Sequence, residues 1–273
     1  MAQMQSFQDQ VALVTGGSRG VGFATAKLLT EKGARVVITA RGERRLMESR
    51  AKLAGAGGQV VAVTGDVGNW DDAERMVAAA IENFGRLDIL VNNAGVSMRG
   101  NFADLSREVC ETVARTNLLG CIYLSHLAVP HLIRNRGQIV FISSIAGLFG
   151  LPGASIYCAT KKALTGLAES MRLELIPQGV NVGVVYLGFT EHDPEKRILA
   201  ADGALVPPDR PAHHTQAHAA SLIVRMLERR KKQLIMTAAG NVGWLAYRLS
   251  PALVEKVILW AQASQTGLYK KFS

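Results

Sequence analysis

The chain has 273 residues, of which 48% are hydrophobic and 19% are charged, and this composition is typical of a folded globular protein. Its 31 Lys and Arg residues exceed its 22 Asp and Glu residues and give a formal net charge of +9, which favours anionic partners such as a phosphorylated cofactor. The basic residues are scattered, without zinc-finger spacing or an RNA-binding aromatic signature, so we expect no nucleic-acid partner.

Cysteine usage and the N-terminal residues bear on the compartment. The three cysteines, Cys110, Cys121 and Cys158, form no CxxC pair, which predicts free thiols in a reducing compartment. The first ten residues lack the basic and apolar stretches of a secretory signal, and no uninterrupted apolar run approaches the roughly 20 residues of a membrane-spanning helix. We therefore expect a cytoplasmic protein.

Short β-branched runs alternate with amphipathic helical stretches up to residue 186. The runs are apolar throughout, as in strands buried on both faces of a parallel sheet, and several of the helical stretches end at a glycine, where a C-cap belongs. This rhythm predicts an α/β fold, a doubly wound parallel sheet of the Rossmann type with helices on both faces. The predicted strands are residues 11–15, 35–39, 59–64, 87–92, 138–143 and 180–186.

The rhythm changes after residue 187. Residues 188–214 are rich in Pro, Gly and charge, and a long insertion of this kind predicts a lid over a substrate site. A helical pattern over 215–230 and a seventh strand over 233–238 complete a single domain of residues 1–240. Residues 241–273 contain two apolar helical pieces separated at Pro251 and form a predicted C-terminal helical extension.

A glycine-rich turn, TGGSRGVG, follows the first strand and opens a helix. Glycines allow the backbone to turn tightly and to approach a pyrophosphate, whose charge then lies at the helix N-terminus. The turn therefore predicts a dinucleotide-binding loop. Its predicted cofactor-binding residues are Gly16, Ser18, Arg19, Gly20, Val21 and Gly22.

The charge at the end of the second strand indicates which nicotinamide cofactor fits. A carboxylate there would bind the ribose hydroxyls and repel a 2′-phosphate, but the sequence has Ala40 followed by Arg41. Arg41 and Arg19 can clamp a phosphate with charge-assisted hydrogen bonds, which predicts NADP(H), unless Arg41 is one solvated charge of a basic stretch. Asp66 and Val67 are further predicted cofactor-binding residues. Asp66 would accept a hydrogen bond from the adenine amino group, the alternative being that it caps a helix or a turn.

Four further motifs follow in a fixed order: NNAG at 92–95, Asn117, a Ser143-Ser144 pair, and YCATK at 157–161. The series TGxxxGxG, NNAG, Asn, Ser, YxxxK resembles that of the classical short-chain dehydrogenases/reductases over about residues 9–240. The resemblance implies that Asn117 positions a water in a proton relay with a lysine, and it favours Ser144 over Ser143 by spacing. It places the NNAG backbone, with Asn93, Ala94 and Gly95, along the nicotinamide side of the cofactor, although Asn92 has an equally good structural role.

The chemistry of these residue types agrees with that resemblance. Tyr157 and Lys161 are i and i+4, so on a helix they share one face. A phenol is a weak acid, with a pKa near ~10 in water, and a neighbouring ammonium stabilises its phenolate. Tyr157 would donate a proton to a carbonyl oxygen as hydride arrives, while Ser144 hydrogen-bonds the same oxygen. Each residue alone has an ordinary structural explanation, and only the combination predicts catalysis by Asn117, Ser144, Tyr157 and Lys161. Tyr157 and Lys161 are also predicted to bind the cofactor.

The segment after the sixth strand departs from the family pattern. Leu187 stands where many relatives have proline, while Gly188 and Thr190 remain candidates for the nicotinamide end of the cofactor site. Apolar side chains flank the predicted serine and the lid, which indicates a bulky hydrophobic carbonyl substrate, the alternative being that they pack the lid down. The predicted substrate-binding residues are Ala146, Leu148, Phe149, Leu151 and Phe189.

Histidines in and after the lid raise the question of a metal. His214 and His218 are i and i+4, with His192 and His213 nearby. No carboxylate or cysteine completes an obvious ligand set, so we expect no metal site.

The extension carries tryptophans and leucines beside cations, including Trp244, Trp260, Lys270 and Lys271. It resembles the tails of hydroxysteroid- and lipid-acting family members, and an apolar face with cations also suits a membrane interface. The favoured alternative is a subunit contact or a cover over the substrate pocket, and the resemblance implies a homodimer or homotetramer.

The sequence as a whole predicts an NADPH-dependent reductase of ketones or aldehydes that also works in reverse as an alcohol dehydrogenase. Two rival functions remain. One is a lipid or steroid oxidoreductase bound peripherally to a membrane, and the other is an NADPH-binding regulator without turnover. The complete Asn-Ser-Tyr-Lys set speaks against the regulator.

Overall fold

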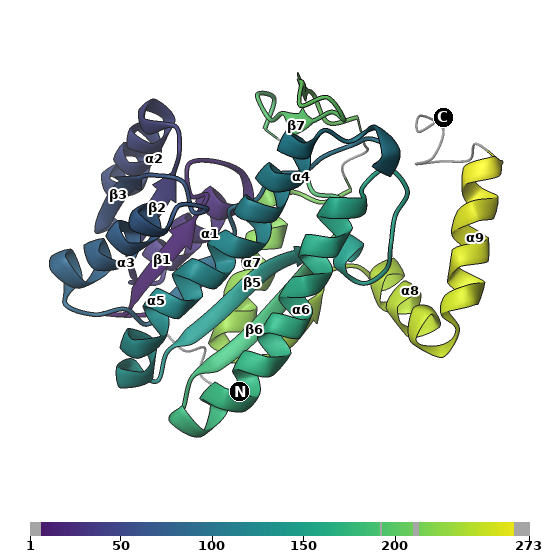
Figure 1. Ribbon diagram of the computed structural model, residues 1–273. Coiled ribbons are helices and arrows are strands. Elements are labelled where there is room, and N and C mark those ends of the chain that lie inside the picture. The colour runs from purple at the N-terminus through teal and green to yellow at the C-terminus, as the bar shows by residue number, and fades with distance from the viewer. Residues whose placement is uncertain (1–6, 192, 210–212, 265–273) are drawn as a thin grey trace.

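The computed structural model describes residues 7–191, 193–209 and 213–264. Its centre is a parallel sheet of seven strands in the order β3-β2-β1-β4-β5-β6-β9 (Figure 1). This confirms the predicted doubly wound sheet. The strands are β1 (Val11–Thr15), β2 (Arg35–Ala40), β3 (Val60–Thr64), β4 (Ile89–Asn92), β5 (Gln138–Ser144), β6 (Asn181–Leu187) and β9 (Gln233–Ile235).

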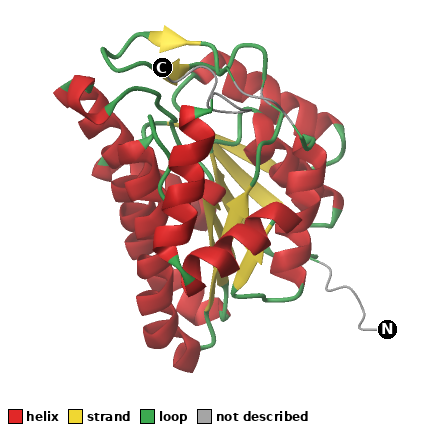
Figure 2. Ribbon diagram, turned by 90° about the vertical axis from the view of Figure 1, so that its right-hand side faces the viewer, coloured by secondary structure: helices red, strands yellow, loops and turns green. Residues whose placement is uncertain are grey.

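Helices cover both faces of the sheet, as Figure 2 shows from the side. On one face α3, α5 and α6 contribute to a common core with the strands, and on the other face α1, α2 and α7 do so. The bounds are α1 (Gly20–Glu31), α2 (Glu43–Gly55), α3 (Trp70–Phe84), α4 (Arg107–Ala114), α5 (Gly120–Asn135), α6 (Ser155–Leu175) and α7 (Gln216–Glu228).

The apolar strands divide their side chains between these two cores. In β1, Val11 and Leu13 pack into one core while Ala12 and Val14 pack into the other, because successive side chains point to opposite faces of a strand. All four are fully buried, and each Val or Leu buried in this way contributes about 1.5–3 kcal/mol. This is why the central strands read as continuous hydrophobic runs.

Helix ends follow local sequence signals. Asn69 caps α3, its Oδ1 accepting from the Asp72 amide at 3.0 Å, and Gly85 ends the same helix with a left-handed φ of 76°. The glycine C-cap predicted for this helix is confirmed. Between these two ends, α3 lies against the sheet with Ala73, Met76 and Ala80 buried.

The seventh strand is shorter than predicted. β9 ends at Ile235 rather than at residue 238, because Thr237 caps the next helix, its Oγ1 accepting from the Gly240 amide at 2.9 Å. α8 (Ala238–Leu249) therefore begins before the predicted start of the extension, and α9 (Pro251–Ala263) follows after Ser250. Figure 1 shows this helix pair to one side of the sheet; Lys270 and Lys271 lie outside the described residues.

One helical run, Arg107–Asn135, is long and apolar enough by length and composition to cross a membrane. The sequence prediction missed it because polar residues interrupt the run. Its apolar window is 44% buried, and α5 within it packs against α3 and β4. In this fold the run consists of α4, a π-helical turn and α5, and α5 packs in the core of the α/β domain.

Parallel strands bring all their carboxyl ends to one edge of the sheet. The chain winds from β1 through β2 to β3 in one direction, and from β4 through β5 to β6 in the other. The order therefore reverses between β1 and β4, and a crevice opens at such a switch point, where ligands bind in doubly wound sheets.

Candidate active site

Most of the predicted site residues surround one cavity of about 820 Å³, called here the main cavity, at the carboxyl edge of the sheet. Asn117, Leu148 and Phe149 are not in its wall. The predicted residues that do line it are Gly16, Ser18, Arg19, Gly20, Val21, Gly22, Arg41, Asp66, Val67, Asn93, Ala94, Gly95, Ser144, Ala146, Leu151, Tyr157, Lys161, Gly188, Phe189 and Thr190.

The glycine loop has the geometry that a pyrophosphate requires. Gly16 and Gly20 have φ values of 64° and 61°, in the left-handed region that favours glycine. A Cβ on Gly22 would lie 2.3 Å from the Gly16 carbonyl oxygen. α1 begins at Gly20 with no side-chain cap and no acidic residue in its first turn, so its first N–H groups suit an anion. These residues fit the pyrophosphate of a dinucleotide.

Thr15, which the sequence analysis did not single out, joins the glycine loop to the NNAG segment. Its Oγ1 accepts from the Asn93 and Ala94 amides, both at 2.9 Å, and Asn93 Nδ2 donates to the Thr15 carbonyl at 2.8 Å. These bonds fix the two sides of the crevice against each other. In the sequence, the threonine that opens the TGxxxGxG motif could have marked Thr15 as part of the site.

At the far end of the loop, Arg41 and Asp66 face each other across the mouth of the cavity. Arg41 Nη1 lies 3.8 Å from Asp66 Oδ2, and both side chains keep substantial exposure. Asp66 Oδ1 accepts from the Gly68 amide at 2.8 Å, so Asp66 is a turn aspartate in the cavity wall. The helix N-cap alternative for Asp66 is wrong, because Asn69 caps α3.

Strand β5 holds α6, the helix that carries Tyr157 and Lys161. Lys161 is buried, and its Nζ donates to the Ile142 carbonyl at 2.8 Å and lies 5.8 Å from the centroid of the Tyr157 ring. Ser143 Oγ donates to the Lys161 carbonyl at 2.9 Å. Both serines lie in the cavity wall. Ser143 is occupied in holding α6, whereas Ser144 Oγ accepts a 3.2 Å bond from the Ala146 amide.

Asn117 lies behind the cavity wall, in a π-helical turn (Arg115–Leu119) between α4 and α5. Its Oδ1 accepts from the Val96 amide at 2.8 Å, and its Nδ2 donates to the Val96 carbonyl at 2.9 Å. A Cβ on Gly95 would lie 3.2 Å from Asn117 Oδ1 and 3.4 Å from Lys161 Nζ. Asn117 is therefore a neighbour of Lys161 that holds the backbone at 95–96.

A buried thiol completes this region. Cys121 Sγ donates to the Asn117 carbonyl at 3.3 Å. Burial raises the pKa of Cys121 to about 11, against the opposing effect of Lys161, so the thiol keeps its proton at neutral pH. The three cysteines are free, as predicted.

Arg99 also lines the main cavity, although the sequence analysis did not select it. Its Nη1 donates to the Met98 carbonyl at 2.9 Å. Burial lowers the pKa of the Arg99 guanidinium, and the nearby Tyr157 and Cys158 oppose this shift. The wall near Tyr157 is therefore not purely apolar. In the sequence, the position of this arginine four residues after Gly95 could have marked it as a cavity residue.

Two of the predicted substrate-binding residues, Leu148 and Phe149, lie outside the wall of the main cavity. A 3₁₀ turn (Ile145–Gly147) follows Ser144 and redirects the chain, so Leu148 packs into the core. Phe149 faces α8 instead, with its ring centroid 6.3 Å from that of Tyr247. It lines a second cavity of about 320 Å³, whose other walls include Lys162, Tyr247 and Ile258.

The described part of the predicted lid lies over the main cavity. It contains a short hairpin of β7 (Ile198–Leu199) and β8 (Leu205–Val206), seen above the carboxyl edge of the sheet in Figure 2. The Leu199 amide donates to the Ser97 carbonyl at 3.0 Å, and the Arg99 amide donates to the Leu199 carbonyl at 2.8 Å. These bonds attach the hairpin to the segment that follows NNAG.

The histidines do not converge on one point. The His213 ring packs near Phe189, and the His214 ring stacks on His218 with centroids 5.6 Å apart. Within residues 7–191, 193–209 and 213–264, no group of three His, Cys, Asp or Glu side chains is placed to hold a metal ion. His192 lies outside the described residues.

Comparison with known proteins now identifies the family. The sequence profile of the short chain dehydrogenases matches residues 10–202. The chain belongs to this family. Its members are oxidoreductases that act on CH–OH and C=O groups with a nicotinamide cofactor, so the predicted family resemblance is confirmed.

Three similar proteins illustrate the range of the family. Ketoacyl reductase HetN of Nostoc sp. is 30% identical over 264 residues, which cover 94% of this chain and 91% of that protein. The 11-beta-hydroxysteroid dehydrogenase-like 4A protein of Arabidopsis thaliana is 37% identical over 193 residues, which cover 70% of this chain and 64% of that protein. A solved short chain dehydrogenase/reductase from Burkholderia phymatum, in complex with NAD, shares the fold, with a TM-score of 0.81 over 92% of this chain and 96% of that one, at 23% identity.

The close approach at Gly22 leads to a test of the cofactor loop. In Gly22→Ala the added methyl group would displace the Gly16 carbonyl. We therefore expect binding of a nicotinamide cofactor, with NADPH as the probe and quenching of protein fluorescence as the readout, to weaken at least tenfold. Gly55→Ala is the matched control, because a Cβ there meets nothing within 4 Å. Unchanged NADPH affinity in a folded Gly22→Ala variant would contradict the placement of the pyrophosphate.

Proposed function

We propose that this protein is an NADPH-dependent reductase of ketones or aldehydes, reversible as an alcohol dehydrogenase, that acts on a bulky hydrophobic substrate. The observation that carries the proposal is the shared cavity: Ser144, Tyr157 and Lys161 line the same space as the glycine loop. A reacting group beside a dinucleotide bound there would meet a hydroxyl and a phenol, with an ammonium next to the phenol.

The proposed roles follow from this arrangement. The nicotinamide, when bound, supplies or accepts hydride. Tyr157 donates a proton to the carbonyl oxygen, while Ser144 donates a hydrogen bond to the same oxygen and stabilises its developing charge. Lys161, fixed by the Ile142 carbonyl, provides a positive charge that favours the phenolate left after transfer. Asn117 is a positioning residue that keeps the backbone at 95–96 beside Lys161.

Tyr157→Phe tests the reaction. The change removes only the phenolic oxygen, so we expect the turnover number for ketone reduction to fall at least a hundredfold, the lower end of the usual general-acid contribution, while NADPH affinity falls far less. Tyr247→Phe in α8 is the matched control and should keep full turnover. A Tyr157→Phe variant with full turnover and an intact fold would overturn the mechanism. If the wild type binds NADPH tightly but oxidises it with no ketone of a graded panel, the regulator without turnover is supported instead.

The choice of NADPH rests on charge at the mouth of the main cavity. Arg19 and Arg41 line it, and Ala40 stands where a carboxylate would favour the unphosphorylated ribose. Asp66 lies 3.8 Å from Arg41, and both groups are exposed enough for a phosphate to take the place of that partner. The NAD named with the solved relative belongs to that protein, which is 23% identical.

Arg41→Ala tests the cofactor preference. Hydrogen bonds to a charged group contribute about 1.5–3 kcal/mol, so we expect kcat/KM for NADPH to fall about 10- to 100-fold while the value for NADH changes little. Arg44→Ala is the control, because Arg44 is 81% exposed and pairs with Glu48 on its own helix. Equal rates of the wild type with NADPH and NADH would contradict the proposed preference.

The proposed substrate class rests on the walls of the cavity near Tyr157. Leu151 and Leu199 belong with Tyr157 to small apolar clusters. Ala146, Phe189 and Ile198 also line the cavity, with Arg99 as a charged group among them. These side chains suit a carbonyl on a bulky apolar body. The names of the similar proteins, a ketoacyl reductase and a hydroxysteroid dehydrogenase-like protein, refer to substrates of this kind in those proteins.

A second candidate, a lipid or steroid oxidoreductase bound peripherally to a membrane, is favoured by one observation. The helix pair α8–α9 exposes a set of large apolar side chains beside the cations Arg248 and Lys256. Such a face suits either a second subunit or a membrane surface, and we favour the subunit. The exposed side chains are Val242, Leu245, Leu249, Leu253, Val257, Leu259 and Trp260.

Replacing Leu249, Leu253 and Trp260 together by Glu distinguishes a contact with a second subunit from a contact with a membrane. Because these side chains are exposed, the domain should keep its fold. We expect the wild type to sediment as a homodimer or homotetramer in analytical ultracentrifugation and the triple variant to sediment as a smaller species. Cosedimentation of the wild type with anionic vesicles, lost in the triple variant, would favour the membrane instead.

A further inference from the structure

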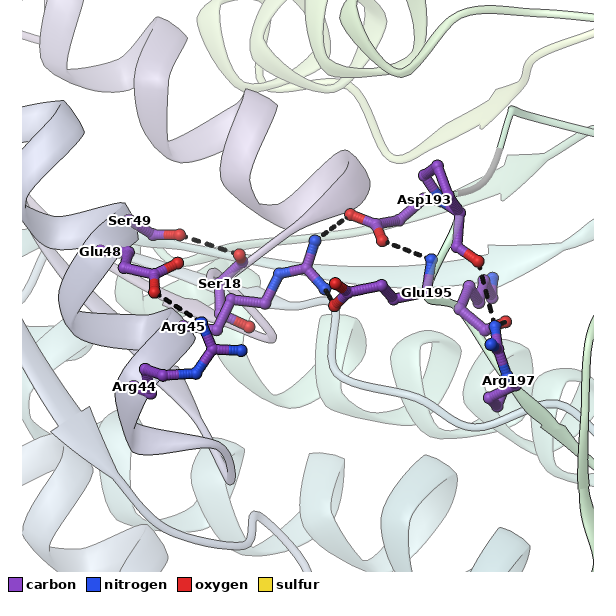
Figure 3. Close-up of polar contacts among 10 residues, drawn as sticks. Ser18, Arg44, Arg45, Glu48, Ser49, Asp193, Glu195 and Arg197 are labelled. Atoms are coloured by element: carbon purple, nitrogen blue, oxygen red, sulfur yellow. Dashed lines mark hydrogen bonds and ion pairs between the residues drawn. The ribbon is translucent and has the colours of Figure 1, made fainter.

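One arginine joins the predicted lid to the cofactor side of the domain. Arg45, in the first turn of α2, donates from Nη1 to Glu195 Oε2 at 2.7 Å, and its Nη2 pairs with the carboxylate of Asp193 (Figure 3). Both acids belong to the lid, about 150 residues further along the chain. We call these three residues the lid latch.

The lid latch lies at the wall of the main cavity, close to the glycine loop. Ser49 is one turn after Arg45, and its Oγ donates to the Ser18 carbonyl at 2.9 Å. Residues at i and i+4 share one face of a helix, so Arg45 stands on the face of α2 that meets the loop. Arg45, Asp193 and Glu195 all line the cavity, together with Arg41.

The acidic side of the lid latch is a preformed turn. The Glu195 amide donates to Asp193 Oδ1 at 2.9 Å, and the Lys196 amide donates to the Asp193 carbonyl at 2.8 Å. Arg197 Nη1 donates to the Pro194 carbonyl at 3.0 Å. The turn therefore presents its two carboxylates together.

The charges of the lid latch do not balance. One guanidinium faces two carboxylates, and the side chains of Arg45 and Asp193 are only 28% and 16% exposed, so solvent screens this pair less than a surface pair. A 2′-phosphate carries a charge of about −1.5 to −2 at neutral pH. Beside a closed latch it would meet two like charges, and both terminal nitrogens of Arg45 would already be bonded to the carboxylates.

A phosphate can also replace the carboxylates. An arginine binds either group through the same pair of N–H donors, so the lid acids occupy on Arg45 the position that a phosphate oxygen would take. An unphosphorylated ribose has no group that competes for Arg45. The closed latch therefore opposes a 2′-phosphorylated dinucleotide specifically.

We propose that Arg45 is a further binding residue for the 2′-phosphate, held by Asp193 and Glu195 until the phosphate displaces them and releases the lid. The lid latch thus weakens NADP(H) binding while leaving NAD(H) binding unaffected, and it couples the occupied phosphate site to the position of the lid. This inference rests on the proposed NADP(H) preference.

The test uses two probes that differ by the phosphate, adenosine 2′,5′-bisphosphate and adenosine 5′-monophosphate, titrated calorimetrically into the full-length protein. The double variant Asp193→Asn, Glu195→Gln keeps the shapes and removes both charges. We expect it to bind the bisphosphate about tenfold more tightly than the wild type does, the size of one charge-assisted hydrogen bond, and the monophosphate equally well. Arg45→Ala should weaken the bisphosphate about tenfold and leave the monophosphate unchanged.

Glu48→Gln is the matched control, because Glu48 lies on the same helix and pairs with Arg44; it should change neither affinity. A structural ion pair without a role in binding predicts that the double variant and Arg45→Ala bind both probes as the wild type does. That result would overturn the proposal, as would weaker binding of the bisphosphate to the double variant.

Hydrogen exchange reports lid release directly. The amides of Glu195 and Lys196 are bonded within the turn, and the Leu199 amide is bonded to Ser97. We expect the bisphosphate to raise exchange in the peptide over 193–199, and the monophosphate to leave it unchanged. Greater protection of that peptide with the bisphosphate would show that the lid closes on the phosphate and would overturn the displacement.

The Arg41→Ala variant separates this inference from the proposed function. If Arg41→Ala weakens the bisphosphate while Arg45→Ala and the double variant do not change it, the NADP(H) preference stands and the lid latch proposal fails. If wild-type protein binds both probes equally and Arg41→Ala changes neither, the NADP(H) preference fails and the lid latch proposal fails with it.

Discussion

The hydroxyl of Thr15 is the contact on which the geometry of the site depends. It accepts two amide bonds from Asn93 and Ala94 and so joins the segments that leave β1 and β4, the two strands between which the sheet order reverses. Together with the bond from Asn93 Nδ2 to the Thr15 carbonyl, this contact holds the glycine loop and the NNAG segment on opposite sides of one crevice. A buried hydroxyl can do this because it accepts two hydrogen bonds and still donates one, here to the Val91 carbonyl at 3.3 Å.

The proposed catalytic wall is supported in the same way, by backbone groups of the neighbouring strand. The carbonyl of Ile142 fixes the ammonium of Lys161, and the hydroxyl of Ser143 fixes the Lys161 carbonyl. Asn117, in its π-helical turn, holds Val96 through both of its amide atoms, and π turns are often found at functional positions. Lys161 is thus held by two neighbours on β5, and the Val96 backbone is held by Asn117, which lies outside the cavity wall.

The chain as a whole has an excess of basic residues, but two arginines at the mouth of the cavity are paired with acidic residues. Arg41 faces Asp66, and Arg45 faces two carboxylates of the lid, so the cations near the ribose end are partly neutralised from within the chain. In the proposed function this arrangement makes the phosphate of the cofactor compete with acids of the protein. Discrimination between cofactors then depends on the whole set of charges and not on Arg41 alone.

The sequence by itself determined the sheet and the place of the glycine loop, because strands buried on both faces must be apolar throughout and because parallel strands bring their ends to one edge. The Ser–Tyr–Lys set was predicted from the resemblance to the family. The sequence could not show that Phe149 turns away toward Tyr247, since a single 3₁₀ turn redirects the residues that follow it. Nor could it pair Arg45 with Asp193, about 150 residues away. Contacts of this kind leave no periodicity in a sequence, and only the tertiary packing of the lid against α2 decides which of the many surface charges meet.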